Sequence, residues 1–287
     1  MATPPAPSQD GSAPSDGTGL SESSSGSTHL DDRAAAKLPH EALHLEALER
    51  MAGLAPYYSW VLDLAESLNG GPLGQRILDA GCGIGNFVEL LRHRSEHVMA
   101  VDLSPKNVAV LRRRFEKASN VEVLQTDLDA QREELRARNV DAICCLDVLE
   151  HIRDDAALVR SFAGILPAGG RLFVKVPAHQ WLYGSVDKAS DHFRRYGRRQ
   201  LVDLVESAGF SVQRARYMNF AGVGPYFVKS RVLKKGSTFS NSFTERQLRW
   251  IRRSIGAFRG VDRCLGFVGP GGGPPVGQSV VLVATRR

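Results

Sequence analysis

Glycines and carboxylates stand at the ends of apolar runs, where they could bind a nucleotide. The loop Gly81-x-Gly83-x-Gly85 follows Asp79 at the end of one such run. Because glycine has no Cβ, the backbone of this loop can approach a ligand closely, and a helix beginning there adds free N–H groups and partial positive charge. Asp102 stands about 20 residues beyond the first glycine, the spacing of an acid that holds ribose hydroxyls.

The spacing of these glycines excludes two other kinds of nucleotide site. The dinucleotide fingerprint G-x-G-x-x-G fails in both registers, because Asn86 or Val88 stands where the third glycine is required. The phosphate loop G-x-x-x-x-G-K-[ST] is also absent from the sequence. We therefore expect neither a nicotinamide dinucleotide site nor a P-loop.

Carboxylates also follow two later apolar runs. Asp127, in Thr126-Asp127-Leu128, is placed to meet an adenine amino group, and Asp147 opens the segment that ends with His151. In open α/β sheets ligands bind at the carboxyl ends of the strands. All these residues are thus expected along one rim of a sheet, where they would form a cofactor site.

The elements that position them follow an alternating rhythm. Strands are expected at Arg76–Ala80, His97–Asp102, Val121–Gln125, Asp141–Leu146, Arg171–Val176, Ser211–Tyr217 and Val280–Ala284. Helices are expected at Asn86–Arg94, Pro105–Lys117, Asp154–Leu166 and Arg198–Ala208. This alternation predicts a doubly wound α/β fold, in which helices cover both faces of a mostly parallel sheet.

Three regions are expected along the chain. Residues 1–33 form a Ser/Gly/Pro-rich disordered tail, residues 34–72 form N-terminal helices, and residues 73–287 form the main domain. A long interruption at about 218–278 is expected to be a helical cap over the ligand, with Ser242-x-x-Glu245 as a capping box. Neighbouring Cys144 and Cys145 are expected on opposite faces of one strand.

Charge and hydropathy suggest where the chain acts. No apolar run approaches the roughly 18 residues that span a bilayer, and no secretory signal stands at the start, so we expect a cytoplasmic protein. The net charge is +6, and ten basic residues crowd into residues 229–263. That stretch could face an anionic membrane surface or RNA, or it could be a solvated helix face.

Over about residues 55–287 the chain resembles the class I S-adenosylmethionine-dependent methyltransferases. Among them it resembles a bacterial subgroup that acts on small molecules. The resemblance implies a seven-stranded sheet whose last strand, Val280–Ala284, inserts antiparallel beside Ser211–Tyr217. It implies S-adenosylmethionine as cofactor, and Tyr58, in Tyr57-Tyr58-x-Trp60, would close over it or pack a helix. The expected cofactor-binding residues are Asp79, Gly81, Cys82, Gly83, Gly85, Asn86, Asp102, Leu103, Asp127, Leu128, Asp147 and Tyr58.

The segment Asp187–Tyr196 resembles the His-x-Arg-Arg-Tyr pattern of that subgroup. His192 would be a general base, Arg195 would bind an acidic substrate, and Tyr196 would position the acceptor. His151 is a rival base. A structural loop is the alternative, with the arginines paired to Asp187 or Asp191.

Two aromatic residues in the same region, Trp181 and Tyr183, are expected to line the acceptor pocket or to pack in the core. No metal is predicted, because the spacing of the acidic residues and His192 does not enforce a metal site.

The resemblance predicts methyl transfer to an oxygen or nitrogen of a small molecule, a specialised metabolite or a lipid- or sugar-linked precursor. Two alternatives stay open: methylation of RNA or protein through the basic 229–263 stretch, and a non-catalytic accessory protein that only holds the cofactor. Nucleic acid is not the expected partner, since no RNA-binding module is present. The oligomeric state is not predicted.

Overall fold

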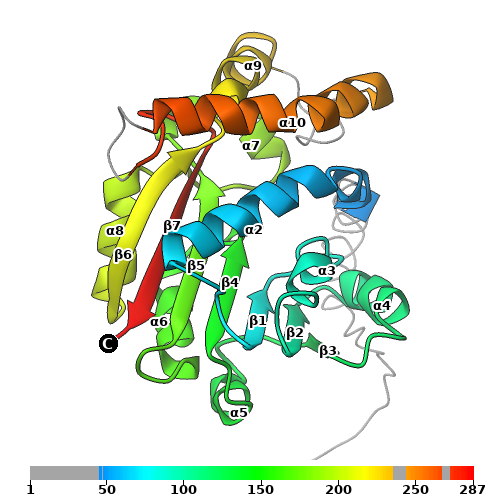
Figure 1. Ribbon diagram of the computed structural model, residues 1–287, viewed down its shortest axis with the longest axis vertical. Coiled ribbons are helices and arrows are strands. Elements are labelled where there is room, and N and C mark those ends of the chain that lie inside the picture. The colour runs from blue at the N-terminus through cyan, green and yellow to red at the C-terminus, as the bar shows by residue number, and fades with distance from the viewer. Residues whose placement is uncertain (1–44, 47, 235–243, 267–271) are drawn as a thin grey trace, which may run out of the picture. The chain divides into compact units, whose positions relative to one another are not determined.

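A seven-stranded mixed sheet forms the centre of the protein (Figure 1). The computed structural model describes residues 45–46, 48–234, 244–266 and 272–287, which all belong to one compact unit. The strands are β1 (Arg76–Ala80), β2 (His97–Asp102), β3 (Val121–Gln125), β4 (Ala142–Leu146), β5 (Arg171–Pro177), β6 (Phe210–Met218) and β7 (Ser279–Arg286). Their order is β3-β2-β1-β4-β5-β7-β6, and β7 runs antiparallel to both of its neighbours. The expected fold and last-strand insertion are confirmed.

Helices cover both faces of the sheet because each strand presents apolar side chains on both sides. One face packs against α2 (Ala55–Asn69), α3 (Val88–Leu91), α4 (Pro105–Arg114) and α10 (Glu245–Leu265). The other packs against α5 (Arg132–Ala137), α6 (Asp155–Ile165) and α8 (Arg198–Ser207). Cys144 belongs to the first core and Cys145 to the second, so these neighbours do lie on opposite faces.

The expected helices differ from the observed ones in two places. The helix expected over Asn86–Arg94 is only α3, since the Ser95 hydroxyl and the Asn120 amide bind the carbonyls of Leu91 and Arg92, both at 2.8 Å. The helix α5 was not expected, because only Leu135 of its residues is buried and it shows no apolar periodicity.

The N-cap of α10 differs from the one that the sequence predicted. Thr244, not Ser242, begins the helix: its hydroxyl accepts from the Gln247 N–H, and the Gln247 side chain accepts from the Thr244 N–H. Glu245 is thus the first helical residue rather than the closing residue of a capping box. Ser242 lies outside the described residues.

The described part of the interruption between β6 and β7 is mostly helical. It contains η3 (Phe220–Gly222), α9 (Val223–Phe227), the π-helical η4 (Val228–Val232) and α10. In Figure 1, α9 and α10 lie beyond the arrowheads of β4 and β5, together with α7 (Ser185–Ala189), a short helix that the sequence pattern did not predict. The insertion therefore sits at the edge where the sequence places the ligand. Among the described helices, none has the length and apolarity to cross a membrane.

The N-terminal region is only partly described. Residues 45, 46 and 48–52 are helical, and α2 follows, packing Trp60, Val61 and Leu64 into the same core as Val281 of β7. The expected tail, residues 1–33, and its boundary lie outside the described residues.

Candidate functional site

The glycine loop after β1 is held against the ends of β2 and β4. Gly81 has φ +69°, and a Cβ there would lie 2.6 Å from Val148, so the loop closely approaches the segment after β4. The N–H groups of Gly81 and Cys82 donate to the carbonyl of Val101 at 2.8 and 3.0 Å. The close approach requires glycine at position 81 and brings the glycine loop against the segment that begins with Asp147.

Asp102 fixes this loop from the end of β2. One carboxylate oxygen accepts the Gly83 N–H at 2.8 Å, and the other accepts the Ser104 N–H and the Asn107 amide at 2.9 and 3.1 Å. Three donors leave a carboxylate with further accepting capacity. The next residue, Leu103, leaves 67% of its surface exposed, which provides an apolar face beside the acid.

Asp79 is a buried acid that lacks a full set of partners. Its side chain is 2% exposed, and Oδ2 has no hydrogen-bond partner among the described residues. Burial, followed by the charge of Asp102, raises the pKa of Asp79 to about 8. A buried carboxyl of this kind is suited to a ligand that brings a hydrogen-bond donor or a positive charge.

The side chain of Asp127 accepts hydrogen bonds from the backbone. Its Oδ1 accepts the N–H groups of Asp129 and Ala130 at 2.8 and 3.1 Å, so the side chain caps the turn before α5. Asp127 is exposed, whereas Leu128 packs against the core on the α6 side. The structure thus places Asp127 at the rim and gives it a capping role there.

A buried lysine that the sequence analysis missed lies next to Asp147. Lys175 of β5 is 4% exposed, and its Nζ lies 2.5 Å from Oδ2 of Asp147 and 5.5 Å from the ring centre of Tyr57. Burial alone lowers the pKa of Lys175, but the charge and the hydrogen bond of Asp147 raise it well above its usual value. A lone lysine within an apolar strand was the available signal.

Tyr58 also lies near Asp147 and Lys175. Its hydroxyl is hydrogen-bonded to Asn86, and burial raises the pKa of Tyr58 to about 12. Asn86 in turn donates to the Leu48 carbonyl at 3.0 Å and accepts from Arg114 at 2.9 Å. Tyr58 is thus a neutral hydroxyl fixed at the rim by the residue that follows the glycine loop.

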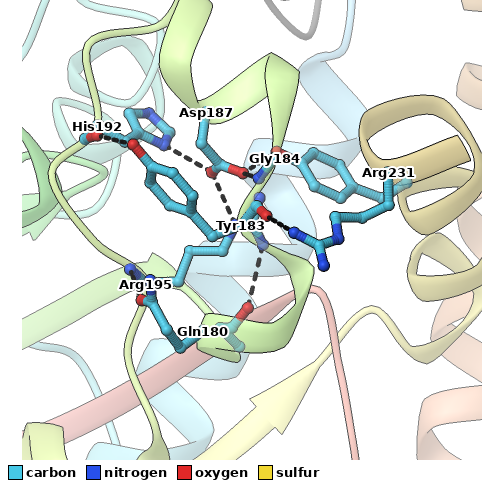
Figure 2. Close-up of polar contacts among 9 residues, drawn as sticks. Gln180, Tyr183, Gly184, Asp187, His192, Arg195 and Arg231 are labelled. Atoms are coloured by element: carbon cyan, nitrogen blue, oxygen red, sulfur yellow. Dashed lines mark hydrogen bonds and ion pairs between the residues drawn. The ribbon is translucent and has the colours of Figure 1, made fainter. Parts of the chain in front are cut away.

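A second cluster gathers at the end of β4, where η1 (Leu149–His151) meets the segment 185–196. The N–H of Phe193 donates to the Glu150 carbonyl at 2.7 Å, and the rings of His151 and His192 lie 4.7 Å apart, edge to face. The structure therefore brings both predicted bases together (Figure 2 shows His192).

Glu150 is the second residue that sequence reasoning passed over. It is fully buried with neither carboxylate oxygen bonded among the described residues, and burial raises its pKa well above the usual value. Glu150, His151 and His192 each offer a ligand atom within 4.8 Å of the others, so these are the described residues that could hold a metal ion.

Two expected site residues point inward instead. The Arg195 side chain is 2% exposed, donates to Asp187 at 2.7 Å and to the Ala178 carbonyl at 3.0 Å, and stacks on Tyr226. Tyr196 is fully buried and donates to Asp155 at 2.8 Å. Neither side chain is presented to a ligand, because each satisfies a buried partner within the protein.

The aromatic residues of this region divide. The Tyr183 hydroxyl donates to the His192 carbonyl at 2.8 Å and so supports the histidine segment. Trp181 is 49% exposed and lies 6.2 Å from the ring of Phe227 in α9. Trp181 thus stays accessible at the junction with the insertion.

Comparison with known proteins decides the family. The sequence model of a family described as "Methyltransferase domain" matches residues 44–215, more than half of the chain. The chain belongs to the class I S-adenosylmethionine-dependent methyltransferases.

Curated relatives agree with this assignment. A ubiquinone biosynthesis O-methyltransferase of Xylella fastidiosa (strain 9a5c) is 41% identical over 105 residues, covering 35% of this chain and 41% of that protein. The namesake in Aeromonas salmonicida (strain A449) is 26% identical over 187 residues, 58% of this chain and 75% of that protein. The matched part of this methyltransferase thus spans about two fifths of the first relative's length.

The fold also matches a solved structure. A methyltransferase in complex with the Trm112 methyltransferase activator of Haloferax volcanii superposes with a TM-score of 0.51 at 14% identity. The match covers 89% of this chain and 96% of that one. Identity this low supports the fold alone.

The described residues fit the cofactor of the family. S-adenosylmethionine carries an ammonium, a positive sulfur, ribose hydroxyls and an adenine. The unpartnered Oδ2 of Asp79 suits a donor or a cation, Asp102 has accepting capacity left for hydroxyls, and exposed Leu103 offers an apolar surface. The accepting oxygens of this rim thus match the donors and the positive charge that the cofactor carries.

Replacing Asp102 by alanine is expected to weaken S-adenosylmethionine binding by about 1–3 kcal/mol, since a charged acceptor is lost. The melting temperature should also fall, because Gly83 and Ser104 lose their acceptor. Isothermal calorimetry and thermal unfolding measure the two effects. Glu116→Ala, an exposed acid just beyond α4, is the control. Unchanged affinity in Asp102→Ala would remove this residue from the cofactor site.

Proposed function

We propose that this methyltransferase moves the methyl group of S-adenosylmethionine to an oxygen of a small molecule. The observation that carries the proposal is His192, an imidazole placed beside His151 at the end of β4, on the rim that bears the cofactor residues. A hydroxyl is protonated at neutral pH, so a nearby base assists its methylation. A neutral amine already has a free lone pair and depends less on a base. The names of both curated relatives also specify an oxygen acceptor.

The chemistry then divides between cofactor and protein. When bound, S-adenosylmethionine supplies a methyl group on a positive sulfur, which leaves as a neutral thioether. His192 accepts the proton of the acceptor hydroxyl while the oxygen forms its bond to the methyl carbon. Asp79 and Asp102 hold the donor at the rim through their accepting oxygens. Holding both reactants in line supplies much of the rate enhancement.

The test uses purified full-length protein with methyl-labelled S-adenosylmethionine. The acceptor panel contains phenols, catechols, aliphatic alcohols, amines, total RNA and a protein mixture. Label on a hydroxyl compound supports the proposal. Label on amines, RNA or protein alone, or tight cofactor binding without transfer to anything, overturns it in favour of one of the alternative functions.

The helical insertion carries exposed apolar side chains beside basic ones. Exposed apolar side chains gather on α9 and η4 and just beyond, at Phe227, Val228, Val232 and Leu233. Exposed Arg231 and Lys234 stand among them. Apolar side chains beside basic ones favour an anionic lipid surface. We therefore place the activity in the cytoplasm at a membrane surface, with the insertion as the cap over the acceptor.

The protein is accordingly expected to sediment with vesicles that contain phosphatidylglycerol and to stay in solution with pure phosphatidylcholine. The double variant Val232→Asp/Leu233→Glu should lose roughly tenfold or more in vesicle affinity, because two apolar contacts are replaced by repelled charges. Val261→Glu is the control, since Val261 is similarly exposed but lies on α10. Equal binding of all three proteins would contradict the surface assignment.

A further inference from the structure

Asp187 of α7 is the centre of a buried polar cluster that includes the proposed base, His192. The side chain is fully buried, and four donors surround its carboxylate (Figure 2). Oδ2 accepts the Gly184 N–H and the Tyr226 hydroxyl, both at 2.9 Å. Oδ1 accepts Nε–H of Arg195 at 2.7 Å and lies 3.0 Å from Nδ1 of His192.

The carboxylate is held in its charged form. Burial by itself raises the pKa of Asp187, but the hydrogen bond from His192 and the charge of Arg195 outweigh it and lower the pKa below its usual value. An ionised carboxylate only accepts hydrogen bonds. The proton in the 3.0 Å contact must therefore sit on Nδ1 of His192.

This contact determines which nitrogen of His192 is basic. In a neutral imidazole one nitrogen donates and the other accepts, so a proton on Nδ1 leaves Nε2 as the accepting atom. The main chain that carries the ring is held by its neighbours: the Tyr183 hydroxyl donates to the His192 carbonyl at 2.8 Å, and the Phe193 N–H donates to the Glu150 carbonyl at 2.7 Å. These two bonds limit movement of the segment from which the imidazole projects.

We propose that Asp187 is the positioning residue of this site: it holds His192 with Nδ1 protonated and Nε2 free to accept the acceptor's proton. The proposal rests on the proposed function. The same carboxylate then stabilises the imidazolium that forms when the proton arrives. Arg195 keeps Asp187 charged, which explains why an arginine expected to bind substrate is buried.

The insertion takes part in this arrangement. Tyr226 belongs to α9, donates to Asp187, and lies under the Arg195 guanidinium, whose carbon is 4.1 Å from the ring centre. Arg231 of η4 donates to the Tyr183 carbonyl at 2.9 Å. Glu150 and His151 face His192 from η1. The orientation of the base thus depends on α7, α9 and η4 together.

The first experiment reads the tautomer directly. Protein labelled with ¹⁵N-histidine is studied by long-range ¹H–¹⁵N correlation at pH 8, and the His192 signals are assigned by their absence from His192→Gln. A protonated Nδ1 with an unprotonated Nε2 is expected. A proton on Nε2 instead would overturn the proposal. This measurement needs no substrate, so it is independent of whether the proposed methyl transfer is found.

The second experiment separates positioning from packing. In Asp187→Asn, kcat is expected to fall at least about tenfold with KM and cofactor affinity nearly unchanged, because the forming imidazolium loses its carboxylate. Asp203→Asn, which removes an exposed acid of α8 outside the cluster, is the control and should retain the wild-type kcat. An active wild type with full kcat in Asp187→Asn would overturn the proposal. If Asp187→Asn fails to fold, the wild-type tautomer decides alone.

Discussion

Replacing His192 by glutamine is expected to lower kcat about 100-fold or more at neutral pH, the usual contribution of a general base. Affinity for S-adenosylmethionine should not change, because the described contacts of His192 are to Asp187 and His151 rather than to the glycine loop.

Steady-state kinetics at neutral pH and calorimetry with the cofactor measure kcat and the cofactor affinity. His93→Gln is the matched control, since His93 is 59% exposed beside Glu89 and far along the chain from the cluster. Because His151 lies beside His192, His151→Gln should be measured in parallel. Full turnover in His192→Gln together with loss in His151→Gln would transfer the role of base to His151.

Asp79→Asn is expected to stabilise the cofactor-free protein while impairing cofactor binding. The pKa of Asp79 in the folded state is about 8, above its value of 3.8 in the unfolded chain, because the carboxyl is buried near Asp102. The folded state therefore holds the proton more tightly. The stability that this proton brings is complete below about pH 4 and is lost as pH rises through about 8.

The free energy of unfolding of the wild type should thus decline between pH 4 and 8 more steeply than that of Asp79→Asn. At pH 8 the variant should be more stable by on the order of a few kcal/mol. Its affinity for S-adenosylmethionine should be lower by about 1–3 kcal/mol, because an amide cannot balance a positive ligand. Urea unfolding at several pH values and calorimetry measure these effects.

The exposed acid Asp203 of α8 provides the control for both measurements through Asp203→Asn. Parallel pH dependence in Asp79→Asn and the wild type would show that Asp79 does not carry the buried proton. Unchanged cofactor affinity would show that its unpartnered oxygen serves no ligand. The two outcomes are separate, because the first concerns the protein alone.

Local pattern was sufficient for most of the framework. Buried strands such as Ala142–Leu146 have continuous apolar runs, and their carboxyl ends must share one edge in a parallel sheet. This predicted that Asp79, Asp102 and Asp147 would meet. Two short polar helices were not predicted because their apolar pattern is weak: α5 buries only Leu135, and α7 has five residues. The cap of α10 was misplaced by two residues, since Ser and Thr both precede that helix.

By itself the sequence determined the fold, the family and the position of the cofactor loop, because spacing along the chain specifies glycines, strand-end acids and the late strand. Only the tertiary structure decided which polar side chains bind other groups inside the protein. Arg195 was expected either to bind an acidic substrate or to pair with Asp187 or Asp191, and the structure pairs it with Asp187. Tyr196 was expected to position the acceptor, yet its hydroxyl donates to Asp155, 41 residues away. Lys175 looked like an ordinary strand residue, yet Asp147 and Tyr57 surround it. Burial and long-range pairing depend on how elements pack, so no local pattern encodes them.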